Sequence, residues 1–231
     1  MARLARVLWN DIAYHVTQRG NSRQSVFCSD QDRHVYLDLL RTNCRRYRLS
    51  LLGYCLMSNH VHLIVVPTRA ESLPSALKYV HGRYATYFNA HQCSAGHLWQ
   101  GRYYSCPMDD AHLWAALRYA ELNPVRARMV DHPCDYPWSS AAVHTGRATD
   151  STLETTLFDS QWTTAGWLTY LGQAEAPQDT ETIRRCTHTG RPLGAADFVG
   201  RLEHATQRRL APQKGGRPRK QQPSDHQLAF A

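Results

Sequence analysis

The sequence predicts an α+β fold of the ferredoxin-like, split βαβ type, in which helices cover one face of an antiparallel sheet. Three observations lead to this prediction. Two apolar segments flank a short polar turn at Ser58-Asn59, which is typical of a β-hairpin. Two longer segments, 29–49 and 72–92, carry apolar residues at helical spacing. One strand segment precedes the first helix and another follows the second, so the order is β-α-β-β-α-β.

The first elements are marked by their ends as well as by their periodicity. Residues 13–21 (AYHVTQRGN) alternate as a strand does and end in a turn signal. Ser29 is suited to cap the helix that we expect over 29–49. Residues 49–57 (LSLLGYCLM) predict the second strand, and the turn joins it to an antiparallel partner within 58–67 (SNHVHLIVVP).

The later elements complete the predicted sheet and add one more helix. Residues 72–92 predict an amphipathic helix. Residues 98–108 (LWQGRYYSCPM) predict a short edge strand that Pro107 closes. Residues 109–124 predict a third helix, which ends or kinks near Asn123 because the residue before a proline avoids the helical region. The sheet is expected to keep its second face available.

The chain changes character after residue 140, and we expect three parts. Residues 1–140 form the α+β domain. Residues 141–211 form a helical extension, which opens with an Ala/Ser/Thr-rich linker or loop and contains helices around 158–171 and 195–210. Residues 212–231 are too polar to pack and are expected to be disordered in isolation.

Composition limits the class of protein. Apolar residues make up 42% of the 231, which is enough for a core, yet no apolar run is long enough to cross a membrane. We also expect no signal peptide, because Asp11 interrupts the start before any long apolar stretch. Seven cysteines without a C-x-x-C pair argue against a disulfide framework and a zinc ribbon, and favour a reducing cytosol.

The charge balance points to a phosphate-bearing partner. The 27 Lys and Arg against 19 Asp and Glu give a formal net charge of +8, and arginine is the dominant cation. A guanidinium group binds phosphate oxygens in bidentate fashion, so this excess favours nucleic acid as a partner. The alternative is an ordinary basic protein.

His60 and His62 are the first candidate functional residues. They stand one residue apart in a predicted strand, so both imidazoles point to the same face. Two imidazoles on one face suit a divalent metal, to which each ring donates one nitrogen. A surface pair, or two buried rings that form hydrogen bonds, remains an alternative from this stretch alone.

The predicted third helix carries a second candidate group. His112, Ala116, Tyr119 and Asn123 fall on one narrow face at 100° per residue. Tyr119 and Asn123, one turn apart, can present a phenol and an amide oxygen to the same ligand. A half-buried tyrosine and a helix-terminal asparagine that bonds backbone groups are the alternative interpretation.

Four segments together resemble a known family. YHVTQRGN, MSNHVHLIV, ALRYAELNPVRARMV and YPWSS, in this order and spacing, are similar to the REP-associated tyrosine transposases. These belong to the single-tyrosine HUH transposases, whose name stands for His, an apolar residue and His. The resemblance covers residues 12–140. The stretches TGRPLGAADF and GGRPRK look like C-terminal extensions of longer members.

The resemblance implies a specific chemistry. His60 and His62 would hold Mg²⁺ or Mn²⁺, and Asn123 stands where such enzymes can supply a third ligand. Tyr119 stands at the position of the nucleophile, which would cut single-stranded DNA, release a 3′-hydroxyl and form a 5′-phosphotyrosine. The implied substrate is a hairpin of a repetitive extragenic palindrome, in a cytoplasmic, nucleoid-associated protein. Whether the protein acts as a monomer or a homodimer stays open.

Several residues are candidates for supporting roles. Tyr103 and Tyr104 are rival nucleophiles, of which at most one can face the metal, and His112 is a candidate general base or else a solvated or capping residue. The candidate DNA-binding residues in the domain and in the tail segment GGRPRK, which looks like the core of an AT-hook, are Arg19, Asn21, Arg83, Arg102, Arg217 and Arg219.

Two other classes of function remain compatible with these residues. One is a DNA-binding protein that keeps the fold but does not transpose DNA. The other is a metal nuclease that uses water as the nucleophile, with Tyr119 in a structural role. A covalent protein–DNA adduct separates the three, because only the transposase forms one.

Overall fold

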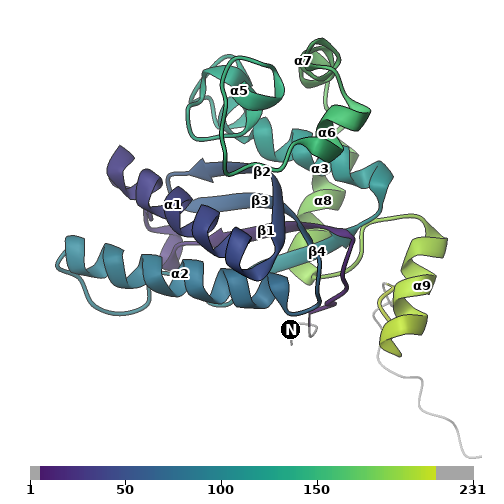
Figure 1. Cartoon of the computed structure of the whole chain (residues 1–231), viewed down its shortest axis with the longest axis horizontal. Helices are drawn as coiled ribbons and strands as arrows, with labels where there is room; N and C mark the ends of the chain where they lie inside the picture. Colours follow the sequence, from purple (N-terminus) through teal and green to yellow (C-terminus); the bar gives the residue numbers. More distant parts are fainter. Residues whose placement is uncertain (1–5, 212–231) are drawn as a thin grey trace, which may run out of the picture.

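The fold is built on one four-stranded antiparallel sheet in the order β2-β3-β1-β4. The computed structural model describes residues 6–211. The strands are β1 (Ala13–Arg19), β2 (Leu49–Met57), β3 (His60–Pro67) and β4 (Tyr104–Met108). With the helices between them, this order confirms the α+β, split βαβ prediction (Figure 1).

Helices α1 (Asp30–Tyr47) and α2 (Ser72–His91) pack side by side on one face of the sheet (Figure 1). Ser29 caps α1 as predicted: its hydroxyl accepts from the backbone N–H of Asp32, whose carboxylate accepts from the N–H of Ser29. Apolar side chains of both helices and of the sheet form the larger core, which includes Tyr36, Leu63 and Tyr84.

The opposite face of the sheet is not left available, and this part of the prediction was wrong. Helix α3 (Asp110–Glu121) packs across β2, β3 and β1, and α8 (Pro177–Thr189) packs on β4 and β1. Ile64 of β3 contributes to a second core on this side, together with Leu117 of α3 and Ile183 of α8. Side chains of β3 alternate between the two faces of the sheet, so Ile64 lies on the face opposite to Leu63. Ile64 is fully buried because α3 and α8 cover that face.

The strand predicted over 98–108 is shorter than expected. It begins at Tyr104, and Pro107 lies inside it, opposite Tyr14 of β1, rather than closing it. The carbonyl of Pro107 accepts from the N–H of Leu193, on the side away from β1. In a strand, the N–H and C=O of one residue point to the same side. An N–H at Pro107 would therefore point away from β1, so the proline costs no hydrogen bond between β4 and β1.

The segment after residue 140 packs against the domain from its start instead of forming a free linker, although residues 145–155 form no helix or strand, as the loop interpretation expects. Ser139, Ser140, Ala141 and His144 are buried, and the short helix α5 (Ala141–His144) lies among them. The other helices beyond α3 are α4 (Asn123–Arg126), α6 (Thr156–Gln161), α7 (Thr164–Gly172) and α9 (Ala196–Thr206), with short 3₁₀ segments at Asn21–Arg23 and Pro133–Asp135. The sequence located α9 and the stretch of α6 and α7, although it predicted these two as one helix over 158–171, and it missed α8.

One buried carboxylate ties this segment to α3. The side chain of Glu121 is fully buried and accepts hydrogen bonds from the hydroxyl of Ser140 (2.6 Å), Nδ1 of His144 (2.6 Å) and the indole N–H of Trp167 (2.8 Å). The second core likewise combines residues from both sides of the predicted boundary at 140, such as Leu117 and Trp167. The end of α3 is therefore fastened to the C-terminal extension.

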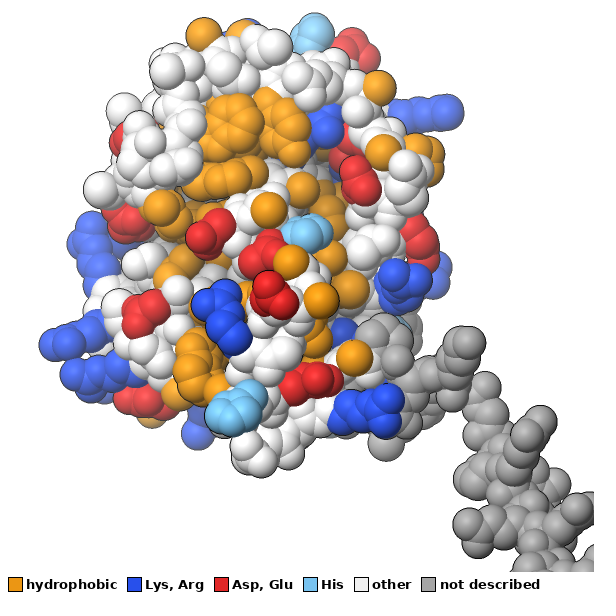
Figure 2. Space-filling model, turned by 90° about the vertical axis from the view of Figure 1, so that its right-hand side faces the viewer, with side chains coloured by type: hydrophobic (Ala, Val, Ile, Leu, Met, Phe, Trp, Pro, Cys, Tyr) orange, Lys and Arg blue, Asp and Glu red, His pale blue; other side chains and the backbone are white. Residues whose placement is uncertain are grey.

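The surface shows one apolar area on this extension. Orange side chains gather in the upper part of Figure 2, where α6 and α7 lie. Trp162 and Tyr170 stack there at 5.1 Å, and Leu157 and Leu168 are exposed. Among residues 6–211, no helix combines the length and apolar character needed to cross a membrane.

Candidate active site

The two histidines of the H-x-H segment lie side by side at the start of β3. Their ring centroids are 4.9 Å apart, which confirms that they share one face of the strand. His62 is buried, whereas His60 is partly exposed. In the neighbouring strand β1, Arg19 pairs with His60 and Thr17 with His62. This face is the one that α3 and α8 cover.

A third histidine, His15 of β1, holds His62 in place. Nε2 of His15 shares a hydrogen bond of 2.9 Å with Nδ1 of His62, and the two rings are nearly parallel, with their centroids 5.1 Å apart. On its other side, Nδ1 of His15 shares a hydrogen bond of 2.8 Å with the hydroxyl of Thr187 in α8. Nε2 of His62 is buried and has no hydrogen-bond partner among the described residues. A chain of hydrogen bonds therefore runs from Thr187 of α8 through His15 to His62, and Nε2 of His62 takes no part in it.

His60 is oriented by a neighbour in the turn. The amide nitrogen of Asn59 donates to the carbonyl of Arg23, so its Oδ1 is the atom that accepts from Nδ1 of His60, at 2.7 Å. Nδ1 of His60 must then carry the proton, and Nε2 keeps its lone pair. A ring nitrogen fixed in this way is what metal-binding histidines show, because the second nitrogen donates to an oxygen.

All three rings are held neutral. Burial, together with the nearby charge of Arg19, lowers the pKa of His60 from 6.5 to about 4. Burial likewise lowers the pKa of His15 to about 3 and that of His62 well below its usual value, with the neighbouring histidines as a further cause for His62. A metal ligand must be unprotonated, so these rings need lose no proton before they bind a cation near neutral pH.

Tyr119 of α3 reaches this cluster from the covering layer. Its side chain is 5% exposed, and its ring meets the edges of His15 and His62 at centroid distances of 5.7 and 5.6 Å. The sequence placed Tyr119 and the histidine pair in separate elements. The structure brings them together, because α3 packs across β1 and β3.

Two arginines contact Tyr119. The guanidinium of Arg126 lies 4.2 Å from the centre of the tyrosine ring and donates to the carbonyl of Tyr119 through Nη2, while its Nη1 donates to both carboxylate oxygens of Glu175 at 2.8 Å. Nε of Arg184 donates to the phenolic oxygen at 3.2 Å. That hydrogen bond is the main cause that raises the pKa of Arg184. The positive charge of Arg126 attracts the π electrons of the ring, and that of Arg184 attracts the lone pairs of the phenolic oxygen.

Asn123 and His112, the other members of the predicted helix face, have different surroundings. The amide nitrogen of Asn123 donates to the carbonyls of Tyr119 and Ala120, and the residue lines the same cavity as the histidines. His112 bonds Oδ1 of Asp109, the residue that caps α3, at 2.6 Å. It does not line the cavity, so the capping role is favoured over the general base.

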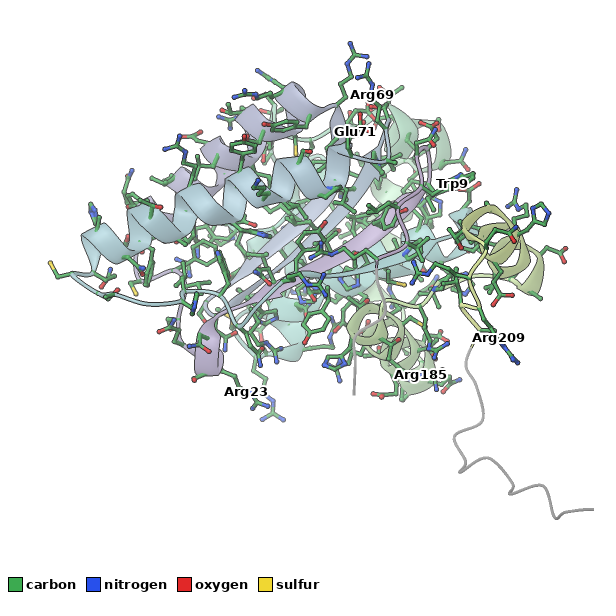
Figure 3. All side chains as sticks on the ribbon, turned by 90° about the horizontal axis from the view of Figure 1, so that it is seen from below. Trp9, Arg23, Arg69, Glu71, Arg185 and Arg209 are labelled. Atoms are coloured by element: carbon green, nitrogen blue, oxygen red, sulfur yellow. The ribbon has the colours of Figure 1, made fainter. Side chains whose placement is uncertain are left out.

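The residues around the histidines enclose a cationic cavity of about 790 Å³. Its lining residues carry five arginines and one glutamate: Arg19, Arg23, Arg126, Arg184, Arg185 and Glu181. Arg23 and Arg185, labelled in Figure 3, lie on the side of the sheet away from α1 and α2. Such a lining suits an anionic chain more than an apolar ligand.

Only one of the two adjacent tyrosines at the start of β4, Tyr103 just before the strand and Tyr104 within it, faces this cavity. Tyr104 lines it and stacks on His188 of α8 at 4.8 Å. Tyr103 points to the other face, where it is buried in the larger core beneath Arg6. The alternation predicted for the pair is confirmed, and Tyr119 is the tyrosine nearest to the histidine rings in the ring contacts of the described residues.

The candidate DNA-binding residues are scattered. Arg19 lines the cavity, and Asn21 follows it, exposed, in the 3₁₀ turn. Arg83 is exposed on α2, the helix that covers the other face of the sheet, so it is not brought to the site. Arg102 precedes β4 and lines a small separate pocket. Arg217 and Arg219 lie outside the described residues.

Sequence reasoning missed the residues that surround the predicted ones. His15 was visible in the first strand, yet nothing local indicates that its ring meets a histidine 47 positions away. Arg184 and Thr187 belong to α8, whose sequence PQDTETIRRCTHT is polar at most positions and buries only Ile183 and Thr187. One buried apolar side chain, Ile183, in 13 residues is too weak a signal for periodicity.

The described residues contain no group of three or more His, Cys, Asp or Glu side chains arranged to hold a metal. A metal ion here would therefore have a smaller donor set, with the ring nitrogens of His60 and His62 and the side chain of Asn123 as the candidates. The buried Nε2 of His62 without a partner, and Nε2 of His60 with a free lone pair, fit a cation at this position.

Comparison with known proteins agrees with the geometry. Residues 9–123 match the family model described as IS200-like transposases. The structure of a REP-associated tyrosine transposase bound to a REP hairpin is similar over 67% of this chain and 98% of the other, with a TM-score of 0.54 and 15% identity. A protein of Deinococcus radiodurans, described as a candidate transposase, matches over 55% of this chain and 92% of the other, with a TM-score of 0.37 and 19% identity. No curated protein matches the sequence.

Proposed function

Residues 9–123 make this chain a member of the IS200-like transposases, and we propose that it cuts and rejoins single-stranded DNA with Tyr119 as the nucleophile. The observation that carries the proposal is the position of Tyr119. Its ring touches His15 and His62 and its hydroxyl bonds Arg184, inside a cavity lined by arginines. A phosphodiester in that cavity would meet a nucleophile and positive charge together.

The histidines support a divalent cation, Mg²⁺ or Mn²⁺, as the cofactor. His60 and His62 would hold it through Nε2, with Oδ1 of Asn123 as the third protein ligand. The chemistry that such a cation supplies when bound is Lewis-acid stabilisation of the charge on a phosphoryl group. Asn59 and His15 fix the two rings from behind, so little ordering remains for the moment of binding.

The covalent step exchanges one ester for another. The phenolic oxygen of Tyr119 forms a bond to phosphorus, and the bond from phosphorus to the 3′ oxygen breaks. The 3′ oxygen keeps the electron pair and, in the net reaction, receives the phenolic proton. A 3′-hydroxyl and a 5′-phosphotyrosine result. Because the new ester is similar in energy to the old one, rejoining needs no nucleoside triphosphate.

The shape and charge of the cavity support a single strand as the substrate. Arg19, Arg23 and Arg185 line it and can follow a phosphate backbone, while Tyr104 stacked on His188 offers an aromatic surface for an unpaired base. The fold is that of a transposase described as bound to a REP hairpin. We therefore propose DNA hairpins of repetitive extragenic palindromes as the target, in a protein that acts at the nucleoid.

The test is a cleavage assay on hairpin oligonucleotides with single-stranded flanks, in Mn²⁺ or Mg²⁺. A denaturing gel that detects both DNA and protein is expected to show a protease-sensitive adduct. Tyr119→Phe removes the adduct and leaves DNA binding within about a factor of three. His60→Ala and His62→Ala remove the activity that depends on the metal. Tyr104→Phe is the matched control, because it deletes a hydroxyl in the same cavity and retains the adduct.

Other outcomes identify the two alternatives. Cleavage without an adduct that persists in Tyr119→Phe indicates a metal nuclease with water as the nucleophile. Tight binding without cleavage indicates a DNA-binding protein that does not transpose.

A further inference from the structure

We propose that Arg184, on a helix beyond the matched family domain, is a catalytic residue that stabilises charge on the hydroxyl oxygen of Tyr119. The inference rests on the proposed function, because it concerns the same nucleophile. It assigns to the C-terminal extension a part of the chemistry. Residues 9–123 contain the nucleophile and the histidines, and α8 at 177–189 would complete the site.

The contact is with the reacting atom itself. Nε of Arg184 donates to Oη of Tyr119 at 3.2 Å, and no other hydrogen bond to this oxygen occurs within residues 6–211. His15 and His62 approach the ring of Tyr119 rather than its hydroxyl. Arg184 is thus the donor placed where charge changes during the reaction.

Arg126 contacts the same tyrosine but has a different part. Its guanidinium lies over the ring, and its two terminal nitrogens are committed to the carboxylate of Glu175 and the carbonyl of Tyr119. It therefore fixes the orientation of the ring. Arg184 uses only Nε in the hydrogen bonds of the described residues, so its two terminal nitrogens can donate to oxygens of the phosphate under attack.

Helix α8 is anchored well enough to place a donor. Thr187 bonds His15 at 2.8 Å, His188 stacks on Tyr104, and Ile183 is buried in the second core. The helix ends at Gly190, which adopts the left-handed conformation (φ 74°) and donates to the carbonyl of Cys186. These contacts hold the segment on both sides of Arg184 against the sheet.

The donor acts in both directions of the reaction. When the bond from Oη to phosphorus forms and the bond to the 3′ oxygen breaks, negative charge is shared between these two oxygens. When the strand is rejoined, Oη is the leaving atom and takes the electron pair. A fixed N–H aimed at Oη lowers the barrier of each step, as donors of an oxyanion hole do.

The effect can be sized from known donors. Removal of one such donor costs about 10²–10³ in rate. Arg184 is exposed, and 3.2 Å is at the long end of the usual range, so we expect a loss of roughly 10- to 100-fold. A helix that merely covers the active site makes the opposite prediction, because loosening it would raise the rate.

The experiment measures single-turnover adduct formation with the full chain at saturating hairpin oligonucleotide and Mn²⁺, beside the Kd for the same DNA. The variants are Arg184→Gln and Arg184→Lys. Arg185→Gln removes the same charge from the same cavity without a contact to Tyr119, so it should change Kd more than the rate. Arg201→Gln, exposed on α9, is the control for net charge and should behave as the wild type.

The proposal expects a rate lower by roughly 10- to 100-fold in Arg184→Gln, partial recovery in Arg184→Lys and a similar loss in rejoining. A rate equal to or above that of the wild type overturns it while the phosphotyrosine mechanism stands. A loss that saturating DNA restores also overturns it, because Arg184 would then only bind DNA. If the wild type forms no adduct, the proposed function fails, and this inference fails with it.

Discussion

Replacement of Glu121 by glutamine tests whether the C-terminal extension is part of one folding unit with the catalytic helix. Glu121 is fully buried two residues beyond Tyr119 and accepts three hydrogen bonds, from Ser140, His144 and Trp167. The glutamine side chain has the same shape but replaces one acceptor oxygen by an NH₂ group. One donor then faces another donor.

The magnitude follows from these three contacts. A buried donor without a partner costs about 1–3 kcal/mol. Each of the other two hydrogen bonds loses about 1 kcal/mol when its acceptor is no longer charged. The sum is about 3–5 kcal/mol, a large share of a typical unfolding free energy of about 5–15 kcal/mol. For a chain of this length, the melting temperature should fall by roughly 6–20 °C.

Urea unfolding followed by tryptophan fluorescence measures the effect, and Trp167 itself reports on the site. Ser140→Ala is the comparison variant: it leaves the carboxylate with two donors but also removes the hydroxyl that accepts from the buried N–H of Tyr54, so it should cost about 1–3 kcal/mol. An unchanged midpoint in Glu121→Gln would refute the reasoning, since the network would then contribute nothing to stability. A transition in two phases would show that residues beyond 140 unfold separately.

Three further predictions follow from the buried groups. Burial lowers the folded-state pKa of His15 and His81 from 6.5 to about 3, so the unfolded chain binds more protons than the folded chain below pH 6.5. Stability is therefore lost as the pH falls from 6.5. The urea concentration at the unfolding midpoint should fall steadily from pH 7 to 6 to 5, and it should fall less in His81→Gln. The hydrogen bond with Cys106 lowers the pKa of Cys186 to about 7. Mass spectrometry after a short iodoacetamide pulse at pH 7 should therefore find Cys186 alkylated before the other cysteines. This preference should weaken in Cys106→Ala. Gly53→Ala would place a methyl group 2.2 Å from a leucine side chain of α3, so the free energy of unfolding in urea should fall by about 1–3 kcal/mol. Gly82→Ala is the control: its methyl group meets nothing within 4 Å and should not destabilise the protein.

Local sequence determined the elements on which the site is built. The alternation in SNHVHLIVVP placed His60 and His62 on one face, and the Ser58-Asn59 turn set the hairpin with β2. Ser29 began α1 through its capping box. Each of these features depends on residues within a few positions of one another, where hydrogen bonding and side-chain direction are dictated by the chain itself.

Only the tertiary structure decided how the site is closed. Contacts such as Thr187 to His15, 172 positions apart, and Arg184 to Tyr119, 65 apart, leave no periodic signal in the sequence. Helix α8 has almost no apolar stripe, and its place is set by the uncovered face of β1 and β4, which must be buried by something. The sequence determined which side chains β3 and α3 present, and packing over that face decided which partners they meet.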